Sequence, residues 1–291
     1  MKTLTLGAGA VTLSRVGFGG MPLSTAGRPD PATAIRVIHA ALDSGATLLD
    51  TADVYCLDND DLGHNERLIA RALEEWTGPR HTIFVGTKGG MDRPEGRWER
   101  RGDPDHLHAA CRRSLQALGT DCIDLYQLHA PDPAVPFAES VGALRELRDA
   151  GLVRWVGLSN VTTARIREAQ NIVPILTVQN RLNPFFREAL SEGVVEYCAE
   201  QGLGFLAYSP VGGGRLNRKL PNHATVQAIA EDRDATPHQV ALAWVRAQGP
   251  TVVPIPGSRT PDHARSAIAS AALELAPEEL AAITDASFSR D

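Results

Sequence analysis

Residues 47–55 read Thr47-Leu48-Leu49-Asp50-Thr51-Ala52-Asp53-Val54-Tyr55. The apolar run at the start of this stretch is typical of a buried β-strand. An acid, Asp50, follows the run directly, and a tyrosine, Tyr55, comes five residues after the acid. The stretch therefore predicts a strand that carries two titratable groups to one end of the sheet to which it belongs.

Two later apolar runs end in the same way. Residues 83–87 lead directly to Lys88, and residues 123–128 lead directly to His129. If these strands are parallel neighbours of the first one, their carboxyl ends lie at the same edge of the sheet. We therefore expect the acid, the tyrosine, the lysine and the histidine to meet there.

The same unit, an apolar strand followed by an amphipathic helix, recurs along the chain. The predicted strands are 16–19, 46–50, 82–87, 123–128, 153–158, 175–178, 204–207 and 251–255. The predicted helices are 31–45, 62–76, one from about 104, 136–150, one from 162 or 163, 187–201, 223–233, 237–248, 261–271 and 277–286. Residues 3–13 alternate polar and apolar side chains around Gly7-Ala8-Gly9, which predicts a short β-hairpin.

Strands that are continuously apolar are typical of a parallel sheet buried on both faces. Eight such units in 291 residues fit a (β/α)₈ barrel, and no linker or shift in composition divides residues 1–291 into more than one domain. A doubly wound sheet is the alternative, but it usually carries a glycine fingerprint between its first strand and helix, and this chain lacks one.

Composition excludes several classes of function. The net charge of −6 argues against a nucleic-acid partner, and no apolar run approaches the roughly 20 residues of a membrane helix. The four cysteines show neither paired spacing nor a metal-binding pattern, and the N-terminus does not resemble a signal peptide. We expect a cytoplasmic protein with reduced thiols and no metal site. The sequence does not indicate an oligomeric state.

The four titratable groups suit the reduction of a carbonyl by hydride. Tyr55 would protonate the nascent alkoxide, and the Lys88 ammonium is expected to lower the pKa of that phenol. Asp50 would keep Lys88 charged and in place, and His129 would orient the substrate carbonyl. Each residue alone has an ordinary structural interpretation, such as a cap, an ion pair or a packed ring. Their shared position at strand ends favours the functional one.

These residues belong to a set of motifs through which nearly the whole chain resembles the aldo-keto reductases. The family's Asp-Thr-Ala-x-x-Tyr pattern is met by residues 50–55, and the Gly-x-x-Glu pattern that follows is met by residues 63–66. Thr87-Lys88, Leu128-His129 and residues 157–160 match further family motifs. The resemblance implies a (β/α)₈ barrel, a hairpin across its bottom, and NADPH bound without a Rossmann domain.

The resemblance also implies a cofactor site. Ser159, Asn160 and Gln179 would bind the nicotinamide carboxamide, and the ring of Tyr208 would stack on the nicotinamide. The remaining cofactor-binding candidates follow the last two strands: Ser209, Pro210, Gly212, Gly257, Ser258, Arg259 and His263. Ser258 and Arg259 precede a helix, where a phosphate is favoured, so NADPH is predicted over NADH.

The chain departs from the family pattern at three places. Cys56 stands where the family usually has glycine, so it either reshapes the substrate entry or exposes an oxidisable thiol. Ser266-Ala267 replaces the usual Glu-Asn pair near the adenine, which puts the adenine contacts in doubt. The chain ends soon after Leu280, without the long segment that closes over the substrate in many members. Selectivity would then fall to three loops, residues 23–30, 56–62 and 89–102.

The sequence thus predicts an NADPH-dependent reductase of a small aldehyde or ketone. Within the family, residues 157–162 and 235–237 resemble short bacterial pyridoxal reductases, and sugar or antibiotic-pathway carbonyls remain open. The alternative is a non-catalytic NADP(H)-binding regulatory subunit on the same fold. A Schiff-base lyase that uses Lys88 is a third hypothesis, which the neighbouring Asp50 disfavours.

Overall fold

The computed structural model describes residues 3–291, so residues 1 and 2 of the predicted 1–291 domain lie outside the described part. Its centre is a parallel eight-stranded sheet in the order β12-β11-β10-β9-β8-β5-β4-β3. These strands are β3 (Phe18–Gly19), β4 (Leu48–Asp50), β5 (Phe84–Gly89), β8 (Ile123–Leu128), β9 (Val153–Ser159), β10 (Ile175–Arg181), β11 (Gly204–Tyr208) and β12 (Val252–Pro254).

Two backbone hydrogen bonds join the first and last strands of this sheet. The N–H of Gly17 donates to Pro254 O and that of Gly19 to Pro256 O, each over 3.0 Å. The sheet therefore closes on itself, and the predicted (β/α)₈ barrel is confirmed.

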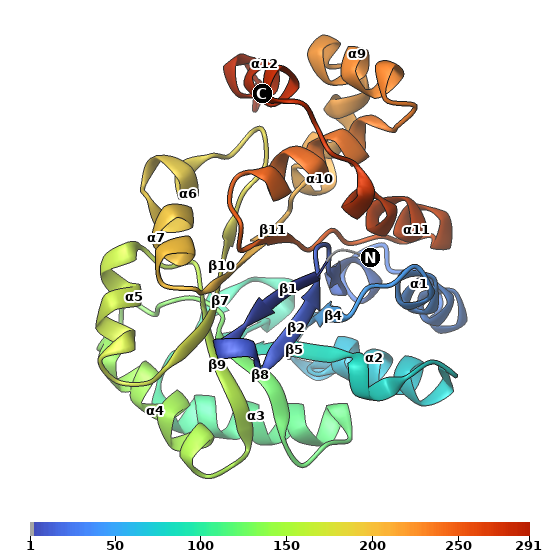
Figure 1. Ribbon diagram of the computed structural model, residues 1–291. Coiled ribbons are helices and arrows are strands. Elements are labelled where there is room, and N and C mark those ends of the chain that lie inside the picture. The colour runs from blue at the N-terminus through green and yellow to red at the C-terminus, as the bar shows by residue number, and fades with distance from the viewer. Residues whose placement is uncertain (1–2) are drawn as a thin grey trace.

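Helices surround the sheet, as Figure 1 shows in a view along the barrel. They are α1 (Pro31–Asp43), α2 (His64–Glu75), α3 (Pro104–Leu118), α4 (Phe137–Asp149), α5 (Thr163–Gln170), α6 (Glu188–Ser191), α7 (Val194–Glu200), α8 (Gly213–Leu216), α9 (Ala224–Asp232), α10 (Pro237–Ala247), α11 (Pro261–Ala269) and α12 (Pro277–Asp285). Several begin at sequence signals for a helix start: Asp30, Asp103 and Thr236 cap their helices, each followed by proline.

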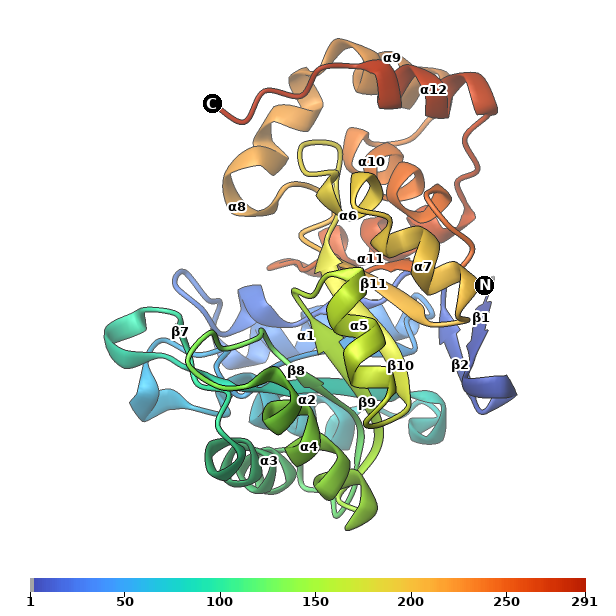
Figure 2. The same ribbon diagram turned by 90° about the vertical axis from the view of Figure 1, so that its left-hand side faces the viewer.

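The predicted hairpin is present and closes the bottom of the barrel. Strands β1 (Thr3–Leu6) and β2 (Val11–Ser14) pair antiparallel around a short turn. The apolar side chains of the hairpin join those that point into the lower barrel in one buried cluster, which comprises Leu6, Val11, Leu13, Leu48, Phe84, Leu125, Leu176, Leu206, Val253 and Ile255. Figure 2 shows the hairpin at one end of the molecule and β7 (Glu99–Arg100) at the other.

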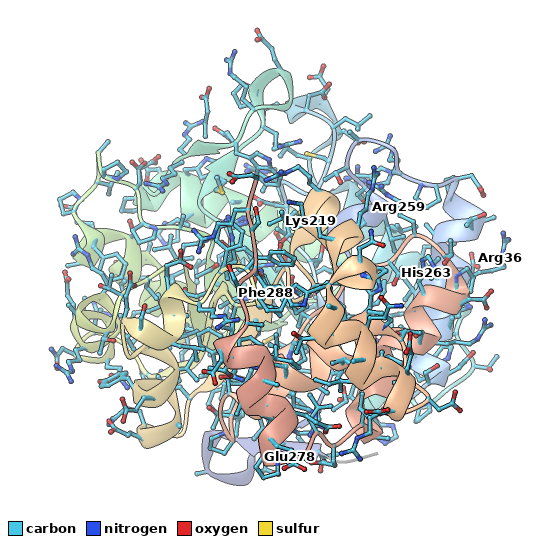
Figure 3. The ribbon with its side chains drawn as sticks, turned by 90° about the horizontal axis from the view of Figure 1, so that it is seen from above. Arg36, Lys219, Arg259, His263, Glu278 and Phe288 are labelled. Atoms are coloured by element: carbon cyan, nitrogen blue, oxygen red, sulfur yellow. The ribbon has the colours of Figure 1, made fainter. Side chains whose placement is uncertain are left out.

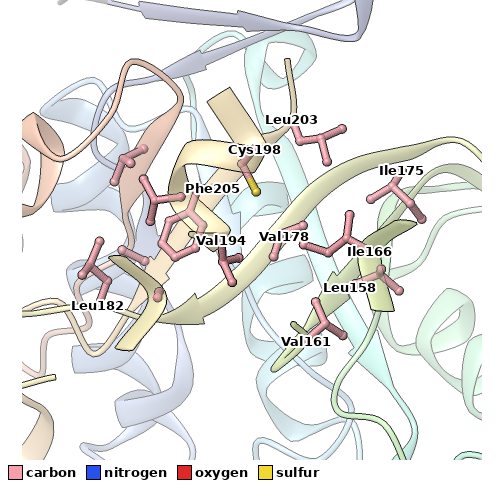
Figure 4. Packing of buried hydrophobic residues seen from close by; sticks show 14 of the residues in the cluster. Leu158, Val161, Ile166, Ile175, Val178, Leu182, Val194, Cys198, Leu203 and Phe205 are labelled. Atoms are coloured by element: carbon pink, nitrogen blue, oxygen red, sulfur yellow. The ribbon is translucent and has the colours of Figure 1, made fainter. Parts of the chain in front are cut away.

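A second layer of apolar side chains lies between the strands and the helices. In Figure 4, Val178 and Phe205 from the strands lie around Val194 and Cys198 of α7, and Leu158 lies beside Val161 and Ile166. Burying each large apolar side chain contributes about 1.5–3 kcal/mol. This layer fixes the strands in place and thereby the positions of the residues at their ends.

The structure differs from the sequence-based expectation in three segments. The predicted helix 187–201 is two helices, α6 and α7, because Gly193 between them has φ = 69°, a conformation that glycine adopts at little cost. Residues 89–102 are not an irregular loop but hold a short hairpin of β6 (Met91–Asp92) and β7. The glycine-rich loop contains the short helix α8.

No helix within residues 3–291 has both the length and the apolar composition that crossing a membrane would require.

Candidate active site

The four predicted catalytic residues meet at the carboxyl ends of neighbouring strands. Asp50 is the last residue of β4, Lys88 lies in β5, and His129 follows β8 directly. The Lys88 ammonium donates to both Asp50 carboxylate oxygens and to Thr51 O at 2.8 Å, and it lies 3.0 Å from the Tyr55 hydroxyl. All four side chains are buried. The ammonium thus lies between the Asp50 carboxylate and the Tyr55 phenol.

Burial and charge shift the pKa values of the lysine and the tyrosine. Burial disfavours the Lys88 ammonium, but Asp50 and Tyr55 more than offset it, so the pKa of Lys88 is raised. Burial also raises the pKa of Tyr55 to about 12, although Lys88 opposes this shift. The lysine therefore lowers the pKa of the phenol, as the sequence predicts, but desolvation outweighs the ammonium and the net pKa stays raised. The Tyr55 hydroxyl therefore stays protonated across the ordinary pH range.

His129 is a neutral imidazole in this setting. Burial, aided by the positive charge of Lys88, lowers its pKa well below 6.5. The ring lies edge-on to Tyr55 with centroids 5.8 Å apart, and its Nδ1 has no hydrogen-bond partner among residues 3–291. A neutral ring beside the proton donor is suited to orienting a carbonyl without competing for the proton.

The predicted nicotinamide residues are hydrogen-bonded to Asp50 and His129, two of the four predicted catalytic residues. Gln179 Nε2 donates to Asp50 Oδ1 at 2.7 Å, and the Ser159 hydroxyl donates to Gln179 O at 2.8 Å. Asn160 has φ = 57° and its Nδ2 donates to His129 O at 2.9 Å. The Tyr208 hydroxyl donates to Asn160 Oδ1 at 2.8 Å. These residues and the catalytic group therefore form one polar network, in which the Gln179 amide bonds Asp50.

The predicted phosphate residues lie elsewhere, around the start of α11. Figure 3 shows Arg259 and His263 on one side of the molecule with Lys219 nearby. Arg259 donates from Nε to Pro22 O at 3.2 Å and from Nη2 to Ala26 O at 2.8 Å, so its guanidinium ties α11 to the segment after β3. Gly257 packs closely, since a Cβ there would lie 2.6 Å from Pro22 Cγ.

The segment after β11 contains several residues with positive φ, a conformation that glycine adopts readily. Gly212 and Gly213 have φ values of 93° and 72°, and Ser209 has 49°. A Cβ on Gly212 would meet Leu216 Cβ at 2.8 Å, so this turn accepts only glycine. Pro210 is buried beside it and Ser258, beyond β12, is also buried.

Cys56 does not expose a thiol. Its side chain is fully buried, and burial raises the pKa of the thiol to about 12. The expectation of an oxidisable thiol at this position is therefore wrong, because neither exposure nor thiolate character is present.

Two buried acids near Lys88, Asp53 and Glu66, were not predicted from the sequence. The side chains of Asp53 and Glu66 are almost fully buried, and both Asp53 oxygens and Glu66 Oε2 have no hydrogen-bond partner in the described chain. Glu66 Oε1 accepts from the hydroxyl of Thr87, the residue before Lys88, at 2.6 Å. Both acids belong to quoted motifs, but nothing in the sequence indicates that they are buried together.

These acids make stability depend on pH. Burial, with the charge of Glu66 next, raises the pKa of Asp53 well above 3.8, and burial raises that of Glu66 above 4.5. The folded state therefore holds protons that the unfolded state has released, and stability falls as pH rises from about 4 towards the raised pKa values.

We expect Asp53→Asn to remove part of this loss. At pH 8 the variant should be more stable than the native chain, whereas at pH 4, where the Asp53 carboxyl is protonated in the folded state and partly protonated in the unfolded state, the two should be about equally stable. Urea unfolding at both pH values measures the difference. Asp262→Asn, at an exposed acid on α11, is the matched control, and an equal gain at pH 4 and pH 8 would contradict the argument.

The sequence and the fold are both similar to those of known proteins. Residues 15–287 match the family model described as the aldo/keto reductase family. The chain is 33% identical to "Aldo-keto reductase str7" of Strobilurus tenacellus, over 94% of this chain and 89% of that protein.

Solved structures resemble the fold over nearly its whole length. The glycerol dehydrogenase AKR11B4 from Gluconobacter oxydans has a TM-score of 0.83 and 29% identity, covering 97% of this chain and 94% of its own. An aldo/keto reductase from Klebsiella pneumoniae, in complex with NADP and acetate, has a TM-score of 0.80 and 26% identity, covering 97% and 94%.

Proposed function

The chain belongs to the aldo/keto reductase family and is an oxidoreductase that acts on carbonyl compounds, and we propose that it reduces an aldehyde or ketone to an alcohol with NADPH. One observation carries the proposal: the Lys88 ammonium bridges the Asp50 carboxylate and the Tyr55 hydroxyl at the open end of the barrel. This arrangement places a proton donor, with its charge partner, where the strands of a barrel present their active site.

The residues present fit a phosphorylated nicotinamide dinucleotide. Amide and hydroxyl side chains lie beside the catalytic group, and the flat ring of Tyr208 is half-buried next to them. The turn at Gly212 brings bare backbone to the surface, and Arg259 lies just before a helix whose first turn favours an anion. Ser159, Asn160, Gln179 and Tyr208 would hold the nicotinamide, and Ser258, Arg259 and His263 the 2′-phosphate.

The bound nicotinamide would supply hydride to the carbonyl carbon. Tyr55 donates its proton to the carbonyl oxygen as negative charge develops there, and the ammonium of Lys88 stabilises the phenolate that remains. Asp50 keeps that ammonium charged, and neutral His129 orients the carbonyl towards the tyrosine. The donors are fixed before the reaction, so little reorganisation is needed when the charge moves.

Two other hypotheses fare less well. A Schiff-base lyase needs a neutral lysine nucleophile, whereas the pKa of Lys88 is raised and its ammonium is bonded to Asp50. A non-catalytic NADP(H)-binding subunit has no use for the assembled proton donor, and it predicts cofactor binding without turnover.

The test is the loss of reduced-nicotinamide absorbance with NADPH and NADH in parallel, against aldehydes that include pyridoxal. We expect turnover with NADPH, and we expect Arg259→Met to raise the KM for NADPH about ten- to hundredfold by removing a charge-assisted contact. The KM for NADH should change less than about twofold, because NADH lacks the 2′-phosphate.

Arg36→Met is the matched control, since Arg36 is an exposed arginine on the same side of the molecule as Arg259 (Figure 3). Equal effects of Arg259→Met on both cofactors would remove the phosphate assignment and leave the reductase. Binding of NADPH without turnover of any carbonyl would instead favour the regulatory subunit.

A further inference from the structure

Three large apolar side chains are exposed among residues 3–291: Met21 at 40%, Leu57 at 41% and Trp98 at 44%. They lie in the segments that follow β3, β4 and β5, which are neighbours in the sheet. An isolated exposed side chain of this kind is ordinary, but these three lie on adjacent segments that follow the carboxyl ends of neighbouring strands. We refer to Met21, Leu57 and Trp98 as the apolar rim.

Trp98 is the member of the rim that contacts the catalytic group. Its ring centroid lies 6.2 Å from that of Tyr55 and 6.0 Å from that of His129, both in edge-on geometry. Tyr55 and His129 are themselves 5.8 Å apart. The three rings therefore pack together, and the partly exposed indole lies beside the tyrosine that would protonate a carbonyl.

Arg93 holds the indole in this position. Its guanidinium carbon lies 3.9 Å from the centroid of the Trp98 ring, and only 6% of the residue is exposed. Its Nη2 donates to Cys56 O at 3.3 Å, whereas Nε and Nη1 have no hydrogen-bond partner in the described chain. A buried cation with so few hydrogen bonds is stabilised chiefly by the aromatic face that it covers.

The backbone fixes this pair from both sides. Arg93 N donates to Asn59 Oδ1 at 2.6 Å, which ties the segment after β5 to the one after β4. The β6–β7 hairpin pairs Asp92 with Glu99, so that Arg93 and Trp98 lie opposite each other at its closed end. The buried guanidinium of Arg93 thus orients the exposed indole of Trp98. A loop that only faces solvent has no need of such a buried charge.

We propose that Trp98 determines substrate selectivity by packing against a planar aromatic group on the carbonyl carbon of the substrate, and that Arg93 is a positioning residue for Trp98. The proposal rests on the proposed function, since it names the substrate class of the same site. Aryl aldehydes and aryl ketones should therefore be preferred over short aliphatic ones.

The experiment compares benzaldehyde with propanal for the native enzyme, Trp98→Ala and Trp98→Phe. We expect Trp98→Ala to raise the KM for benzaldehyde about tenfold and that for propanal less than about twofold, with kcat nearly unchanged, because the lost contact is aromatic packing. Trp98→Phe should restore most of the preference. An unchanged ratio of the two KM values, or equal losses of kcat for both aldehydes, would overturn the proposal.

Arg93 is tested in the same way. Arg93→Met should reproduce part of the Trp98→Ala pattern, Arg93→Lys should rescue it, and Arg100→Met, at an exposed arginine of β7, should leave it unchanged. Tryptophan fluorescence that shifts in Arg93→Met but not in Arg93→Met/Trp98→Phe would show that the indole has moved. Equal KM ratios in Arg93→Met and the native enzyme would refute the positioning role.

A binding measurement separates this proposal from the proposed function. Calorimetric titration of benzaldehyde into the enzyme with NADP⁺, which cannot reduce it, requires no turnover. About tenfold weaker binding in Trp98→Ala supports the aromatic contact even if the reductase assignment fails. Equal affinity in the two proteins rejects the contact even if the enzyme reduces carbonyls.

Discussion

Tyr55→Phe is expected to lower kcat by a factor on the order of 10²–10⁴, the usual contribution of a positioned general acid. The hydroxyl is the only part that the change removes, and its pKa of about 12 in this structure keeps it protonated and ready to donate. The phenyl ring can still pack edge-on against His129 and Trp98. NADPH should therefore bind with nearly native affinity, as fluorescence titration would measure, while turnover is lost.

Tyr197→Phe is the control for the loss of a phenol elsewhere. The Tyr197 hydroxyl donates to Gln170 at 2.7 Å on the outer side of the barrel. That variant should retain its kcat. If Tyr55→Phe kept most of the native kcat, Tyr55 would not be the proton donor.

Lys88→Met should lower both stability and activity, because it leaves the Asp50 carboxylate buried without its cation. Lys88 is fully buried, and its ammonium makes two contacts of 2.8 Å with that carboxylate. Breaking a buried ion pair from one side typically costs about 3–5 kcal/mol. Urea unfolding at pH 7 measures this loss of stability. The kcat should also fall, because the variant lacks the ammonium that stabilises the Tyr55 phenolate.

The double variant Asp50→Asn/Lys88→Met distinguishes the two effects. It contains no unpaired charge, so most of the lost stability should return, whereas kcat should remain low because the ammonium is still absent. A single variant as stable as the native protein would show that the pair is not the source of stability. A double variant with native kcat would show that Lys88 does not assist Tyr55.

The barrel and the meeting of Asp50, Tyr55, Lys88 and His129 followed from the sequence, because strand ends can be located by the apolar runs that precede them. Residues 123–128 were predicted at the observed bounds of β8, and Asp50 and His129 stand at the predicted strand ends. The helix 187–201 was wrong because its apolar pattern continues across Gly193, and only the observed φ reveals the break.

The pKa values and the side-chain contacts of the site could not be predicted from the sequence. Spacing predicts that Lys88 lies near Tyr55, but the pKa of the phenol depends on how much water is removed, which is a property of the packed structure. The bond from Gln179 to Asp50 and the stacking of Arg93 on Trp98 likewise join side chains whose directions no sequence pattern fixes.

The position of the hairpin that closes the bottom of the barrel also indicates where a tag or solid support can be attached to this protein. Residues 3–14 lie at the opposite end of the molecule from β7 (Figure 2), and they are anchored there by Leu6, Val11 and Leu13. An affinity handle or solid support attached ahead of β1 would therefore leave the reacting end turned towards the solution. Immobilisation from that side suits the protein to repeated use on a surface.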